Sequence, residues 1–154
     1  QSYKDDDRIT EEDIVEAIPK TLQDNIFDLT QLILTKKIDQ ARDLVKDLTL
    51  QGEDEIKLIA IMLGQFRLYT QVKILQESGQ SESQMVSSLG HYLGRNPNPY
   101  QIKFALRDSR RLSLDFLQNS IRYLIQADYQ IKTGVYEKGY LFEKALLQIA
   151  SQSN

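Results

Sequence analysis

Four basic residues lie close together in the second half of the sequence and are the strongest candidates for binding chemistry. They are Lys103, Arg107, Arg110 and Arg111. A predicted helix over residues 81–89 precedes them, so the segment could form a helix-turn-helix motif that binds DNA. The connection predicted between the two helices, residues 90–98, is about twice as long as the three- or four-residue turn of that motif. We therefore favour a solvated or subunit-facing basic surface, and nucleic-acid binding remains the alternative function.

A second candidate is a pair of opposite charges on a predicted helix. Asp128 and Lys132 lie four residues apart, and the order of acid before base is favourable for an ion pair. Asp128 falls on the apolar stripe of its helix, so we expect a partly buried carboxylate that Lys132 or Arg122 neutralises. The alternative is a contact with another subunit. Arg67, on the polar stripe of another helix, is a further candidate for the surface or the interface.

The sequence contains no set of residues that predicts catalysis or cofactor binding. His91 is the only histidine, there is no cysteine, and no nucleophile motif lies near His91. The run of Asp5, Asp6 and Asp7 lacks the alternating ligands and the glycine of a calcium loop. Neither of the common glycine-rich phosphate-binding motifs occurs. We therefore expect no active site, no metal and no cofactor in this chain.

Helices must position these candidates, and the clearest predicted helix runs over residues 54–78. It contains no proline, and its apolar residues fall on two faces at helical spacing. Only a narrow polar stripe remains, formed by Lys57, Arg67 and Gln71. A single neighbour cannot cover apolar stripes this wide. The pattern predicts a central helix that other helices surround.

Capping residues, glycines and prolines predict the remaining helices, and no segment shows the period of two that indicates a strand. The other predicted helices run over residues 10–17, 25–34, 40–51, 81–89, 99–111, 114–133 and 137–150. The expected N-caps are Asp24 or Asn25, Asp39, Ser113, and a capping box of Ser81 with Gln84. The expected helix-ending glycines are Gly52, Gly79, Gly90 and Gly134. The predicted fold class is an all-α helical bundle of about seven to eight helices.

Composition limits the class of protein further. The chain has 154 residues and a formal charge of −3, but residues 1–18 hold seven carboxylates against two basic residues, which leaves +2 for the rest. A nearly neutral body suits protein contacts better than long-range capture of nucleic acid. The longest apolar run, residues 58–63, is far shorter than the roughly 20 residues of a membrane span. We expect no membrane segment and a cytoplasmic protein, and the polar N-terminus without methionine suggests that the chain starts inside a longer one.

Several sequence motifs resemble the C-terminal part of the delta-subunit family of the bacterial DNA polymerase III clamp loader. The motifs are DNIFDL at residues 24–29, GQFRLYTQVK at residues 64–73, PY at residues 99–100 followed by Lys103, Ala105 and Leu106, and ADYQIKTG at residues 127–134. Each motif alone is common, but their order and spacing together are fairly specific. The resemblance covers most of the chain from about residue 9 to residue 150.

This resemblance implies a fold and a role for the chain. Delta subunits of this family have an AAA+-like domain, a small helical lid and a helical collar domain. Residues 1–20 would be the end of the lid, and residues 21–154 the collar, which is the oligomerisation domain. The collar would hold delta beside the gamma or tau and delta-prime subunits in a ring that loads the sliding clamp onto DNA during replication.

The same resemblance limits what this chain would do by itself. The clamp-binding residues of the family lie in the N-terminal domain, so contact with the sliding clamp would not involve these residues. Contact with DNA would be indirect, and the parent complex would be the DNA polymerase III holoenzyme, a DNA-directed DNA polymerase.

The basic residues also allow a prediction about stability. Because we expect Arg107 and Arg111 to lie on the surface, we expect charge reversal at both to leave the melting temperature nearly unchanged.

Overall fold

The chain is helical throughout the part that the computed structural model describes, residues 18–93 and 99–153. The helices are α2 (Lys20–Leu34), α3 (Ile38–Leu50), α4 (Glu55–Glu77), α5 (Glu82–Leu93), α6 (Pro99–Ser109), α7 (Leu114–Lys132) and α8 (Lys138–Ala150). With seven helices and no strand among these residues, the predicted all-α class is confirmed. The helix predicted over residues 10–17 lies outside the described residues.

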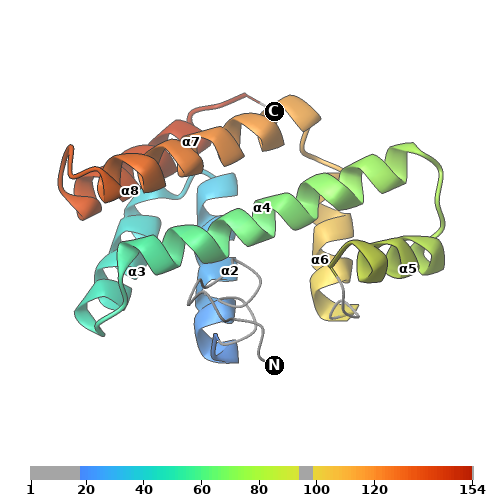
Figure 1. Cartoon of the computed structure of the whole chain (residues 1–154), viewed down its shortest axis with the longest axis horizontal. Helices are drawn as coiled ribbons and strands as arrows, with labels where there is room; N and C mark the ends of the chain where they lie inside the picture. The colour runs from blue at the N-terminus through green and yellow to red at the C-terminus, as the bar shows by residue number, and fades with distance from the viewer. Residues whose placement is uncertain (1–17, 94–98, 154) are drawn as a thin grey trace, which may run out of the picture.

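Helix α4 is the centre of the fold, as its two apolar faces predict. It packs against α2, α5, α6, α7 and α8. Figure 1 shows α7 running alongside α4, whereas α2 and α6 run across it. The buried side chains of α4 are Leu58, Ile59, Ile61, Met62, Leu63, Phe66, Tyr69 and Val72. Because these residues cover more than half of the circumference of the helix, several helices are needed to remove them from water.

Predicted caps are confirmed at Ser113, at Ser81 with Gln84, and at Gly134, and Asp54 is a further N-cap that was not among the expected ones. The Asp54 carboxylate accepts from the Ile56 N–H at 2.9 Å at the start of α4, and the Ser113 hydroxyl accepts from the Phe116 N–H at 3.0 Å at the start of α7. Ser81 and Gln84 form the reciprocal capping box before α5. Gly134 follows α7 with φ of +71°, a conformation that glycine adopts without strain.

Three predicted boundaries are wrong. Helix α2 starts at Lys20, not after Asp24 or Asn25, because Pro19 constrains the residue before it but leaves the following residues free to be helical. Helix α3 starts at Ile38 with Lys37 at the N-cap position, which places Asp39 in the first turn. An acidic residue there still interacts favourably with the helix dipole.

The third error concerns the connection between α5 and α6. Helix α5 continues through Gly90 to Leu93, and α6 starts at Pro99, so only residues 94–98 separate them. A glycine inside a helix costs only about 1 kcal/mol, which neighbouring residues can offset. His91 therefore belongs to a helix and not to the predicted loop.

One described helix, α4, has the length and apolar composition of a membrane span. It is also the helix that the other elements surround. The central helix of a globular domain has the same composition, because its neighbours replace lipid as the apolar environment. Packing within the domain therefore accounts for the hydropathy of α4.

Two long-range polar contacts fix the start and the end of α8. The Lys138 ammonium donates to the Asp54 carboxylate at 2.7 Å, which joins the start of α8 to the N-cap of α4. At the other end, the Lys36 ammonium donates to the Ala150 and Gln152 carbonyls. Lys36 has a positive φ of 62°, which is unusual for a residue with a side chain. The side chain thereby satisfies carbonyls that the end of a helix leaves unpaired.

The contact at Asp54 predicts a small dependence of stability on pH. The hydrogen bond from Lys138 lowers the pKa of the Asp54 carboxyl below its usual value of 3.8. Its contribution to the free energy of unfolding is therefore present above pH 3.8 and is lost as the pH falls through the lower pKa of the folded state. Because both side chains are about half exposed, we expect only a few tenths of a kcal/mol.

Urea denaturation of the Asp54→Asn variant measures this contribution. Asparagine is also a good N-cap, so the substitution isolates the charge. The difference between the free energies of unfolding of the wild type and the variant should be larger at about pH 7 than at about pH 2.5. An equal difference at both pH values would contradict the assignment.

Candidate interaction surfaces

A fully buried carboxylate organises the end of α6. Asp108 has no exposed surface, and its Oδ2 atom accepts hydrogen bonds from the Gln31 Nε2 atom at 2.7 Å and from the Tyr69 hydroxyl at 3.1 Å. Its Oδ1 atom accepts from the Arg107 Nε and Arg111 Nη2 atoms, each at 3.0 Å. Four hydrogen-bond donors from other residues therefore satisfy the Asp108 carboxylate, whose burial would be very unfavourable if it were unpaired.

This hydrogen-bond network joins three helices. Gln31 comes from α2, Tyr69 from α4, and Asp108 from α6. Burial, reinforced by the nearby Asp108 carboxylate, raises the pKa of the Tyr69 hydroxyl. The hydroxyl therefore stays protonated and acts as a donor to Asp108. The network fixes where the end of α6 lies on the central helix.

The two arginines of the network reach the surface. Their side chains are 53% exposed at Arg107 and 56% exposed at Arg111. The Arg107 guanidinium also lies 4.9 Å from the centre of the Phe104 ring, and that ring is 4.8 Å from the ring of Phe27 on α2. Buried carboxylate, surface guanidiniums and an aromatic pair thus form one arrangement across α2 and α6.

Lys103, Arg107, Arg110 and Arg111 are all exposed, so the predicted basic surface exists. We call these four residues the α6 basic cluster. Among the described residues, no hydrogen bond or ion pair involves Lys103 or Arg110.

The expectation that charge reversal at Arg107 and Arg111 leaves the melting temperature nearly unchanged has to be corrected. Reversing these charges would place carboxylates against the buried Asp108. We now expect that substitution to destabilise the fold.

The helix-turn-helix alternative receives little support from the packing. The connection of residues 94–98 is shorter than predicted, which weakens the original argument against the motif. However, both α5 and α6 pack mainly against α4. Two of the four proposed DNA-binding residues, Arg107 and Arg111, are also bonded to an internal carboxylate. Side chains fixed in this way are less free to read bases in a groove.

The predicted ion pair on α7 is confirmed. The Lys132 ammonium lies 2.9 Å from the Asp128 carboxylate, whose side chain is 27% exposed. Arg122, the other predicted partner, instead donates to the Asn119 side chain.

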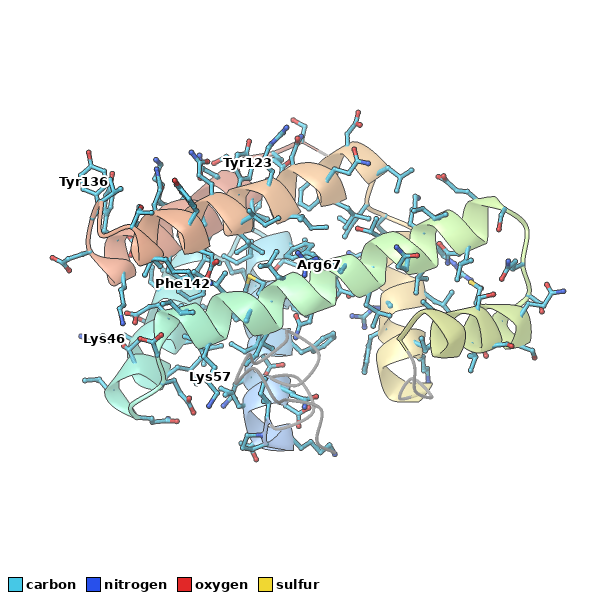
Figure 2. All side chains as sticks on the ribbon, viewed as in Figure 1. Lys46, Lys57, Arg67, Tyr123, Tyr136 and Phe142 are labelled. Atoms are coloured by element: carbon cyan, nitrogen blue, oxygen red, sulfur yellow. The ribbon has the colours of Figure 1, made fainter. Side chains whose placement is uncertain are left out.

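Arg67, a further predicted surface residue, is half-buried near the middle of α4 (Figure 2). It lies two residues from Tyr69, on nearly the opposite side of the helix. The structure therefore does not bring Arg67 into the α6 basic cluster.

Exposed apolar side chains concentrate at the connection between α7 and α8. Of the seven large hydrophobic residues that are exposed in the described part of the chain, five come from residues 125–140. They are Ile125, Tyr129, Val135, Tyr136 and Tyr140, and we call them the α7–α8 corner. The rings of Tyr136 and Tyr140 pack edge to face with centres 5.7 Å apart, and Tyr136 projects from the end of the domain in Figure 2.

The surroundings of the corner are also suited to contact with a protein. Tyr140 lines a shallow hollow between α7 and α8, together with Tyr123 and Leu147. Tyrosine combines a large apolar ring with a polar hydroxyl and is enriched in protein interfaces. Asp128 and Lys132 were predicted on α7, whereas the tyrosines of the corner were not predicted as a surface, because the sequence pattern does not distinguish an exposed apolar residue at a helix end from a core residue.

The expectation of no metal site has no counter-evidence in the described residues. No group of three or more potential metal ligands comes together there. Asp5, Asp6 and Asp7 lie outside the part of the chain that the structure describes, and so does the side chain of His91.

Comparison with known proteins identifies the family. The family described as DNA polymerase III delta subunit, C-terminal domain, matches residues 23–149. The chain belongs to this family. It is 32% identical over 149 residues to the DNA polymerase III subunit delta of Bacillus subtilis (strain 168), an alignment that covers 97% of this chain and 41% of the relative.

A solved structure shares the fold of this delta C-terminal domain. The Bacillus subtilis DNA clamp loader delta protein superposes with a TM-score of 0.76 at 33% sequence identity. The alignment covers 94% of this chain and 41% of that chain. The chain thus spans about two fifths of the length of both delta proteins, and the resemblance predicted from the four sequence motifs is confirmed.

Proposed function

We propose that this chain is the collar of a clamp-loader delta subunit, an oligomerisation module that holds delta in the loader ring. The observation that carries this proposal is the α7–α8 corner, where five exposed apolar side chains lie within sixteen residues of a delta C-terminal domain. Exposed apolar residues that gather in one region favour a contact with another protein. A rigid helical bundle with such a region is suited to joining subunits.

The proposed partners are the collar domains of the gamma or tau and delta-prime subunits. In this assembly residues 21–154 form the collar and residues 1–20 belong to the end of the lid. The chain itself performs no reaction, and it acts in the cytoplasm. Tying the subunits together at the collar lets ATP-driven movements elsewhere in the ring act on the sliding clamp, while contact with the clamp is made by the N-terminal domain of delta.

Mixing experiments test this function directly. The chain is combined with purified collar domains of the gamma and delta-prime subunits, and the mass of each mixture is measured by light scattering after size-exclusion chromatography. A one-to-one complex with at least one of them is expected. If neither collar domain binds at concentrations well above the Kd of a stable protein–protein interface, the proposed function is wrong.

Substitutions in the corner test which surface makes the contact. A Tyr129→Ser, Tyr136→Ser, Tyr140→Ser triple variant should weaken the complex by at least about tenfold, because buried tyrosines dominate the binding energy of many interfaces. The matched control is Ile74→Ser, which removes a side chain that is 45% exposed near the end of α4, the end that lies away from the α7–α8 connection in Figure 1. This control should bind within about twofold of the wild type. Equal binding by the triple variant would exclude the corner as the contact.

A further inference from the structure

The α6 basic cluster carries more positive charge than the protein around it neutralises. Arg107 and Arg111 both bind the same oxygen of Asp108 at 3.0 Å, so their contacting nitrogens are no more than twice that distance apart. One buried carboxylate thus faces two guanidiniums, while Lys103 and Arg110 add charge without a partner among the described residues. Like charges this close repel one another unless a further anion neutralises them.

The guanidiniums also retain unused hydrogen-bond donors. Arg111 bonds to Asp108 through Nη2, and among the described residues it makes no other hydrogen bond. Arg107 uses Nε for Asp108 and places Nη2 at 3.4 Å from the Gln31 side-chain oxygen. A guanidinium has five N–H donors in a fixed plane, so both residues can bind a second anion without leaving Asp108.

Asp108 fixes the direction of these donors before any ligand arrives. Its own position is set by Gln31 and Tyr69, which belong to two other helices. Side chains that are held in their binding geometry lose less entropy when a ligand binds. The arrangement therefore orients two half-exposed arginines at a fixed place on the surface.

We propose that the α6 basic cluster binds the carboxylates of an acidic, partly apolar segment of a partner protein. The complementarity of charge calls for an anionic partner. The partly exposed ring of Phe104 lies beside Arg107 and packs against the ring of Phe27, so an apolar side chain of the segment can contact the site together with its carboxylates. A protein segment is favoured over a polynucleotide because residues 19–154 carry a formal charge of only +2 and because Asp108 holds two of the arginines, so the domain lacks the field that captures an extended polyanion.

The proposal is tested with fluorescent probes and the full chain. The main probe is a short peptide rich in glutamate and phenylalanine, and its controls are the same peptide with glutamine in place of glutamate and an oligothymidylate of equal charge. We expect the acidic peptide to bind more tightly than both. Arg111→Gln should weaken its binding about tenfold, the loss typical of one charge-assisted hydrogen bond.

Matched variants separate the site from the fold and from general charge. Lys46→Gln removes one exposed positive charge from α3, at the other end of α4 in Figure 1, and should change binding less than about twofold. If Arg111→Gln does not fold, the Lys103→Gln, Arg110→Gln double variant replaces it, because those side chains have no partner among the described residues. Either variant should weaken binding of the acidic peptide.

Several results would overturn the proposal. They are absence of peptide binding, equal binding of the glutamine peptide, tighter binding of oligothymidylate through the same arginines, and self-association of the chain that Arg111→Gln abolishes. The third result would identify a nucleic-acid site, and the fourth a second copy of the chain as the occupant. Serine variants at the α7–α8 corner should leave peptide binding unchanged, so failure here is distinguishable from failure of the proposed collar assembly.

Discussion

Replacing Asp108 by alanine is expected to lower the free energy of unfolding by roughly 3 to 4 kcal/mol. The substitution removes the acceptor of the Tyr69 hydroxyl, which is buried, and it takes from the Gln31 side chain a hydrogen bond of 2.7 Å. An unpaired buried donor costs about 1 to 3 kcal/mol. Arg107 and Arg111 would also lose the charge between them, but they are half exposed and water would replace part of that interaction.

Chemical denaturation of the full chain measures this effect. The matched control is Asp43→Ala, which removes an exposed carboxylate of α3 and should change stability by less than about 0.5 kcal/mol. Tyr69→Phe gives a second measurement, since it removes one donor and keeps the carboxylate. An Asp108→Ala variant as stable as the Asp43→Ala control would show that the network is not part of the folded state.

Local sequence signals predicted the parts of this fold that depend on neighbouring residues. The N-cap at Ser113 and the capping box of Ser81 with Gln84 act on backbone groups three positions away, so their side-chain types were sufficient. The central position of α4 followed from the width of its apolar surface. Helix starts at Lys20 and Ile38 were missed, because neither begins with a side-chain cap.

Long-range pairing could not be predicted in the same way. Asp108 stands among charged residues on the last turn of α6 and looks like a solvated side chain, yet its partners Gln31 and Tyr69 are 77 and 39 positions away. Only the packing of α2 and α6 on α4 brings these groups together. The surface role predicted for the α6 basic cluster came from its charges, whereas the expectation that Arg107 and Arg111 are dispensable for stability ignored this hidden carboxylate.

The same dependence on packing makes α4 the most sensitive element to a loss of volume. Phe66 has no exposed surface, and its ring packs edge to face against that of Tyr69 with centres 5.8 Å apart. Phe66→Ala should cost roughly 3 to 5 kcal/mol, because the lost burial is compounded by a cavity that rigid neighbouring helices cannot fill.

A second variant separates the effect of the cavity at Phe66 on stability from a simple loss of apolar surface. Leu50→Ala removes apolar atoms from a side chain that is 76% exposed, so the denaturation midpoint should move by an amount equivalent to less than about 0.5 kcal/mol. Phe66→Leu keeps most of the volume and should fall between the two. If Phe66→Ala were no more harmful than Leu50→Ala, α4 could not be the helix that the others enclose. A loss of several kcal/mol would instead follow from the complete burial of Phe66, since water cannot fill a gap that the surrounding helices enclose.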